Sequence, residues 1–164
     1  MKQKNALALA AWNLYPLTRD PAVVSFLLKN DGDDILDVAR ELLAQSWQGA
    51  PDAALAATLQ NRLIDYLWQK SDDENGEQGA LELLAALEAL CRDLLQGGSR
   101  AQKAAENALD YRLDYLAENC SDDSYRELAR ALAAQRATLA KQGGKVAVPL
   151  GSGQDALLAA FGAN

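Results

Sequence analysis

Apolar residues recur at three- and four-residue steps through most of this chain, which is the spacing of one buried helical face. The clearest stretch covers residues 80–96 and ends at Gly97-Gly98, a good left-handed helix stop. Its apolar stripe consists of Leu81, Leu84, Leu87, Leu90 and Leu94, with Cys91 alongside. This pattern predicts an amphipathic helix that packs on other helices.

The same pattern, read together with start and stop signals, predicts further helices. They cover about residues 2–15, 21–29, 33–48, 51–69, 100–119 and 121–142. Pro16 predicts a break or kink after the first helix. Asp20 followed by Pro21 predicts the start of the second, with Asp as cap and Pro at the first helical position. Few β-branched residues occur, which favours helix over sheet.

The pattern changes after Gln142. Gly143-Gly144 ends the last long helix, residues 145–150 read as extended, and residues 155–161 suit one or two helical turns. This tail either packs across the bundle or is partly disordered, and its alternating apolar residues favour packing. They are Val146, Val148 and Leu150. We therefore predict one all-α domain, a bundle of about six or seven helices over residues 1–142, with a Gly-containing tail over residues 143–164.

Composition narrows the range of functions. The net charge of −7 argues against general nucleic-acid binding, which depends on neutralising phosphates. No histidine occurs, which removes the usual zinc sites and histidine-based acid–base catalysis. The two cysteines, Cys91 and Cys120, are expected to be reduced, and no apolar run is long enough to span a membrane. These features predict a cytoplasmic protein without a cofactor.

The helix predicted over residues 100–119 carries an acidic ridge in which each member is four residues from the last. The ridge consists of Glu106, Asp110, Asp114 and Glu118. Ala104, Ala108, Tyr111 and Tyr115 are expected to line the opposite, buried face. The next helix is locally basic, so antiparallel packing would bring opposite charges together. The ridge is therefore one of two things. It is either a solvated face whose charge repulsion is reduced by those basic residues, or a docking surface for a basic partner.

A polar loop after residue 70 resembles a calcium-binding loop in spacing. Ser71, Asp73, Asn75, Gly76 and Glu82 fall at positions 1, 3, 5, 6 and 12 of the EF-hand pattern. Ser at position 1 and Gln78 at the usual apolar position 8 depart from that pattern, and no second loop matches. An ordinary acidic loop is the alternative interpretation.

A short set of motifs near the N-terminus resembles the YjaG-like bacterial proteins. The set comprises Ala6 to Pro16 with its Tyr15-Pro16 ending, then Phe26, then a helix with Leu42-Leu43 that ends near Trp47. The family pattern has Cys-Glu-Arg before the Tyr-Pro, where this chain has Ala11-Trp12-Asn13-Leu14. The resemblance implies a bacterial, cytoplasmic, all-helical protein, and it supplies no catalytic residues.

Together these observations predict a non-enzymatic protein that acts by protein–protein interaction, such as an immunity or inhibitor protein that binds a basic partner. The ridge is the predicted binding surface. A second copy of the chain is another partner compatible with the Leu- and Ala-rich helices. The alternative function is a divalent-metal-binding protein or enzyme that uses the carboxylate-rich loops.

Overall fold

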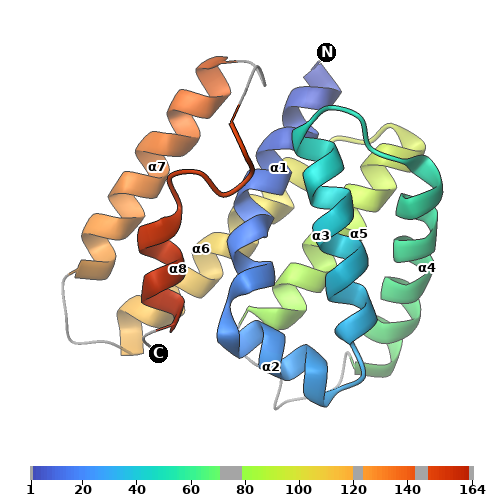
Figure 1. Cartoon of the computed structure of the whole chain (residues 1–164), viewed down its shortest axis with the longest axis horizontal. Helices are drawn as coiled ribbons and strands as arrows, with labels where there is room; N and C mark the ends of the chain where they lie inside the picture. Colours follow the sequence, from blue (N-terminus) through green and yellow to red (C-terminus); the bar gives the residue numbers. More distant parts are fainter. Residues whose placement is uncertain (1, 71–78, 120–123, 143–147, 163–164) are drawn as a thin grey trace.

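The computed structural model describes residues 2–70, 79–119, 124–142 and 148–162, and within these ranges all regular structure is α-helical (Figure 1). The all-α prediction is confirmed. The described chain forms a single bundle of eight helices. They are α1 (Lys2–Arg19), α2 (Pro21–Lys29), α3 (Asp33–Trp47), α4 (Ala53–Lys70), α5 (Ala80–Gln96), α6 (Ala101–Asn119), α7 (Ser124–Gln142) and α8 (Asp155–Gly162). None of the described helices is long and apolar enough to cross a membrane.

Helix α1 runs through the middle of the bundle and makes its most extensive contacts with α6 and α3 (Figure 1). Helix α5 contacts α1, α4 and α6. The buried face of α1 combines small and large apolar side chains, Ala10, Ala11, Leu14 and Leu17, all with no exposed surface. Alanines let neighbouring helices approach α1 closely, and each fully buried leucine contributes about 1.5–3 kcal/mol.

Several element boundaries follow the sequence signals. Asp20 caps α2 by accepting a hydrogen bond from the Ala22 N–H at 3.0 Å, and Pro21 is the first helical residue. Gly97 ends α5 in the left-handed conformation with φ of 78°. These caps form because an Asp oxygen satisfies a free helix-start N–H and glycine adopts positive φ without steric cost.

Helix α1 does not end at Tyr15; it continues through Pro16 to Arg19. A proline inside a helix removes the hydrogen bond to the carbonyl four residues earlier, here that of Trp12. The side chain of Gln154 supplies the missing donor, with Nε2 at 2.8 Å from the Trp12 oxygen. Of the predicted break or kink, the break after Tyr15 is therefore wrong, because a tertiary contact replaces the lost backbone bond.

Helices α7 and α8 lie together on one side of the bundle, beside α1 and α6 (Figure 1). Among the described side chains of α7, Tyr125 and Leu132 are buried, while α8 buries Leu157 and Phe161. From Val148 onward the tail packs on the bundle, since the Val148 carbonyl accepts a hydrogen bond from Trp47 Nε1 at 2.7 Å. The predicted short C-terminal helix is α8.

Candidate interaction surface on helix α6

The outward side of α6 differs from the predicted one. The buried side includes Leu109 and Leu116, whereas Tyr111 is 43% exposed. The prediction that Tyr111 lines the buried face is therefore wrong. Arg112 takes the interior position instead, at 3% exposure. This places Tyr111 on the same exposed side of the helix as Asp114 and Glu118.

The predicted acidic ridge divides into two halves. Its first half faces α7, where Arg136 Nη1 lies 2.9 Å from Asp110 Oδ1. The Arg136 Nε donates to Asn13 Oδ1 of α1 at 2.6 Å. Glu106 is half-buried, and its carboxylate accepts a 3.4 Å hydrogen bond from Gln102. Arg136 of α7 therefore connects this half of the ridge on α6 with α1. The contact agrees with the predicted pairing of the acidic α6 with the basic α7.

The second half of the ridge, Asp114 and Glu118, is exposed. Of the four ridge residues, Asp110 alone forms an ion pair within the described part of the chain. Both exposed carboxylates lie toward the C-terminal end of α6, which has no basic residue in its last turn. The backbone dipole makes that end negative, so the charge of Glu118, which lies in the last turn, costs about 0.3–1 kcal/mol, whereas Asp114 lies more than one turn before the end. Their mutual repulsion at four-residue spacing adds roughly 0.2–0.5 kcal/mol.

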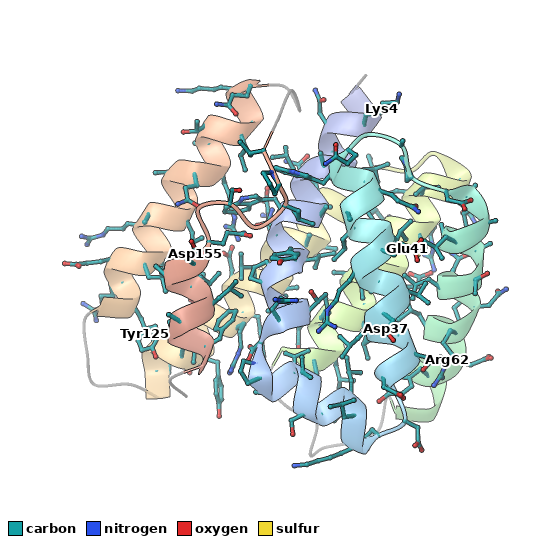
Figure 2. All side chains as sticks on the ribbon, in the orientation of Figure 1. Lys4, Asp37, Glu41, Arg62, Tyr125 and Asp155 are labelled. Carbon is teal, nitrogen blue, oxygen red and sulfur yellow. The ribbon has the colours of Figure 1, made fainter. Side chains whose placement is uncertain are left out.

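A second acidic stretch lies along α3, where Asp37 and Glu41 are exposed on the outer side (Figure 2). Here the helix itself accounts for the charge at its start, because Asp33 and Asp34 occupy the favourable N-terminal turn. Asp34 also accepts from Arg62 Nε at 2.8 Å, and this hydrogen bond lowers the pKa of the Asp34 carboxyl. The start of α3 thus has a structural explanation that Asp114 and Glu118 lack.

A buried ion pair lies where α2, α6 and α8 meet. Arg112 donates through Nε and Nη2 to the two carboxylate oxygens of Asp20, the residue that caps α2. The guanidinium also lies 5.5 Å from the ring centroids of Tyr115 and Phe161. Asp20 has no exposed surface, so the ion pair is part of the protein interior and not of the surface. Its one sequence signal is that Arg112 falls between Leu109 and Leu116 on the apolar side of α6.

Most of the predicted metal loop lies outside the described residues, including Ser71, Asp73 and Asn75. Glu82 is described, and its carboxylate accepts a hydrogen bond from the Gly79 N–H at 3.1 Å, closing the start of α5. Across the described residues, no group of three or more Asp, Glu, Cys or His side chains is placed to hold a metal ion. Glu82 therefore has a local structural role.

Cys91 is fully buried in the core, as expected. Burial, aided by the nearby Glu88 charge, raises the pKa of the Cys91 thiol to about 12. A thiol with this pKa stays protonated near neutral pH, so Cys91 is not a nucleophile. Trp12 and Trp47 are also buried, whereas Cys120 and the Trp68 side chain lie outside the described part of the chain.

A hollow of about 480 Å³ lies at the turn between α5 and α6. Arg92 and Arg100 line it together with Asp93 and the Gly97-Gly98-Ser99 turn. The Asp93 carboxylate accepts a hydrogen bond from the Ala101 N–H at 2.6 Å, so Asp93 caps the start of α6. A bound anion here would meet the negative charge of Asp93, and Arg92 already pairs with Glu88 at 2.7 Å. The hollow is thus poorly suited to binding an anion.

Comparison with known proteins identified no family model, no curated protein and no solved structure that matches this chain. The resemblance to the YjaG-like proteins therefore stays a prediction.

Proposed function

We propose that this chain is a non-enzymatic interaction protein, of the immunity or inhibitor type, that binds a basic protein partner. The proposed binding surface is the exposed half of the α6 ridge together with the neighbouring tyrosine. We call it the acidic tyrosine surface, and it consists of Tyr111, Asp114 and Glu118.

The observation that carries this proposal is the pair of carboxylates near the negative end of α6, with no ion pair inside the described chain. Folding brings Arg136 to Asp110 and leaves Asp114 and Glu118 in solvent. In this position Glu118 opposes the helix dipole, and the two carboxylates repel each other. A lysine or arginine of a partner would relieve both unfavourable terms.

Tyr111 strengthens this assignment because tyrosine is enriched at the centres of protein–protein interfaces. Its ring is 43% exposed and lies one residue from the paired carboxylate of Asp110. An arginine that stacks on an exposed aromatic ring gains about 0.5–1 kcal/mol and can still reach a neighbouring carboxylate. The acidic charge would also steer a basic partner toward this surface and raise the association rate.

The test is to capture binding proteins from lysate of the native cells with the wild-type chain and two variants. Asp114→Asn/Glu118→Gln removes two charges from the acidic tyrosine surface. Asp33→Asn/Asp37→Asn removes the same net charge from α3 and is the matched control. We expect a basic protein to bind the wild type and the α3 control, and to lose about tenfold or more in affinity for the α6 variant.

Raising the salt concentration should weaken the wild-type complex more than any residual complex of the α6 variant. The α6 variant should also be slightly more stable than the wild type, by about 0.3–1 kcal/mol, because it removes the Glu118 charge that opposes the helix dipole and its repulsion with Asp114. Equal binding by both double variants would show that net charge, and not this surface, governs association. Failure to capture any basic partner at low salt would contradict the proposal as a whole.

A further inference from the structure

Helices α4 and α5 pack closely against each other and lie on the side of the bundle away from α7 (Figure 1). Each of them leaves one large apolar side chain in solvent, Ile64 of α4 at 48% exposure and Leu95 of α5 at 36%. A single exposed apolar residue is normal on a monomer and needs no explanation. Here, however, each of the two residues belongs to a longer strip of side chains without net charge.

The strip on α4 is uncharged and exposed or half-buried along its length. It consists of Ala53, Ala57, Gln60 and Ile64. Its direction follows from Arg62, which faces α3 through its ion pair with Asp34. Successive helical residues point about 100° apart, so Ile64, two positions after Arg62, points away from α3. Because α4 contacts α3 on one side and α5 on the other, the strip lies beside α5.

The strip on α5 has no net charge. It consists of Leu81, Ala85, Glu88, Arg92 and Leu95. Its direction follows from Asp93, which faces α6 because it caps that helix at Ala101. Leu95, two positions later, therefore points away from α6 and toward the side of α4. The two charges of the strip, Glu88 and Arg92, cancel in an ion pair of 2.7 Å.

Both strips repeat at alternating steps of four and three residues, which is the spacing of a coiled-coil seam. They come in addition to the faces that these helices bury in the core, represented by Leu59 and Leu63 of α4 and by Leu87 of α5. We call the two strips together the α4–α5 seam. An antiparallel pair of helices with such an outer seam fits a second antiparallel pair, and the product is a four-helix bundle.

We propose that the α4–α5 seam is the contact surface of a homodimer, in which a second copy of the chain supplies the other two helices of the bundle. Charge identifies the second copy as the occupant. Chains that each carry −7 repel each other wherever acidic surfaces meet, and the seam is a neutral surface on which they can meet. Its one ion pair is also self-complementary. Across a two-fold axis, Glu88 of each copy meets Arg92 of the other.

The size of the seam sets the strength of this contact. The seam is as long as α5, about 25 Å, and as wide as two helices, about 20 Å. The resulting area of about 500 Å² is below the roughly 800 Å² per partner of a standard stable interface. We therefore expect a reversible dimer with a Kd on the order of 10 μM.

The dimer is independent of the acidic tyrosine surface, because the seam faces away from α6. Asp114→Asn/Glu118→Gln should dimerise as the wild type does. Salt also separates the two proposals. It should weaken capture of a basic partner, whereas it should not weaken the dimer, since it screens the repulsion between two acidic chains.

The first test is sedimentation equilibrium of the full-length chain over a concentration range of about 1–100 μM. We expect a monomer–dimer equilibrium for the wild type and at least about tenfold weaker association for Ile64→Glu, which places a charge in the seam of each copy. Leu28→Glu is the matched control, because it adds the same charge at a more exposed apolar residue, 58%, on α2. Circular dichroism checks that both variants are folded.

A wild-type chain that stays monomeric over this range would overturn the proposal. Equal weakening by Ile64→Glu and Leu28→Glu would also overturn it, because net charge would then explain the loss.

The second test exchanges charges within the seam. Glu88→Arg and Arg92→Glu each bring like charges together across the two-fold axis, so each variant alone should associate about tenfold more weakly or worse. An equimolar mixture restores both intermolecular pairs and should dimerise almost as the wild type does. Mixing leaves the repulsion within each helix unchanged, so recovery reports contact between copies. A mixture that associates no better than the separate variants would overturn the two-fold alignment of α5.

Discussion

The helices α1–α6 and the helices α7–α8 are held in place by different forces. The first group packs through continuous apolar faces, such as Leu42 and Leu43 of α3, which have no exposed surface. The second group contributes few buried apolar side chains and is positioned by directional hydrogen bonds, in particular those of Arg136 and Gln154. The comparison teaches that one all-helical chain can combine a non-directional apolar core with a part whose position depends on individual polar contacts.

The largest effect is expected where the two groups meet, at the buried pair of Asp20 and Arg112. Asp20→Ala leaves the Arg112 charge buried without its partner and removes the cap of α2. Breaking a buried pair in this way costs about 3–5 kcal/mol. Urea denaturation at neutral pH measures the loss of unfolding free energy.

The matched control is Asp34→Ala, which breaks the Asp34–Arg62 pair on the surface. Because the Asp34 side chain is 55% exposed, we expect a loss of only about 0–1 kcal/mol. Losses of similar size at the two positions would show that burial does not separate these ion pairs.

A leucine truncation in each group sharpens the comparison of their packing. Leu43 of α3 and Leu132 of α7 are both buried, at 0% and 2% exposure. We expect Leu43→Ala to cost about 3–4 kcal/mol, because α3 cannot move into the cavity. Leu132→Ala should cost about 2 kcal/mol, because α7 has fewer apolar contacts and can shift to fill part of the cavity left by the leucine. Equal losses in thermal or urea denaturation would contradict the distinction between the two groups.

Between the two groups of helices, the smallest effect, apart from that of the surface control Asp34→Ala, is expected from Arg136→Ala, which removes the contacts of α7 with Asn13 and Asp110. These hydrogen bonds are partly exposed, and their loss should cost about 1–2 kcal/mol. Hydrogen exchange should become faster in α7 while the amides of α3 and α5 keep their protection. A uniform increase over all helices would mean that α7 is an integral part of the main core.

The sequence predicted the helices well because each carries a repeating apolar face and clear end signals. Asp20-Pro21 and Gly97 act as the caps that local chemistry predicts. Helix α1 was predicted too short, because the rule that proline breaks helices considers only the local backbone. The donor that keeps α1 continuous comes from Gln154, far along the chain.

The candidate surface was predicted in part. The spacing of the ridge identified Asp114 and Glu118, but it could not show that α7 covers the other half. The predicted burial of Tyr111 was wrong, because Arg112, the next residue, takes the interior position. The buried partner of Arg112 is Asp20, a residue 92 positions away in the sequence, and periodicity within one helix carries no information about such a partner.

The proline in α1 also fixes the register of the C-terminal helix. In the interior of a regular helix, each backbone carbonyl already accepts a hydrogen bond from the N–H four residues later. A side-chain amide of a neighbouring segment therefore has no preferred carbonyl to bind. Pro16 marks one carbonyl by removing its donor, and Gln154 can satisfy it in only one alignment. Pro16, although proline usually interrupts helices, thus determines which turn of α1 the side chain of Gln154 binds.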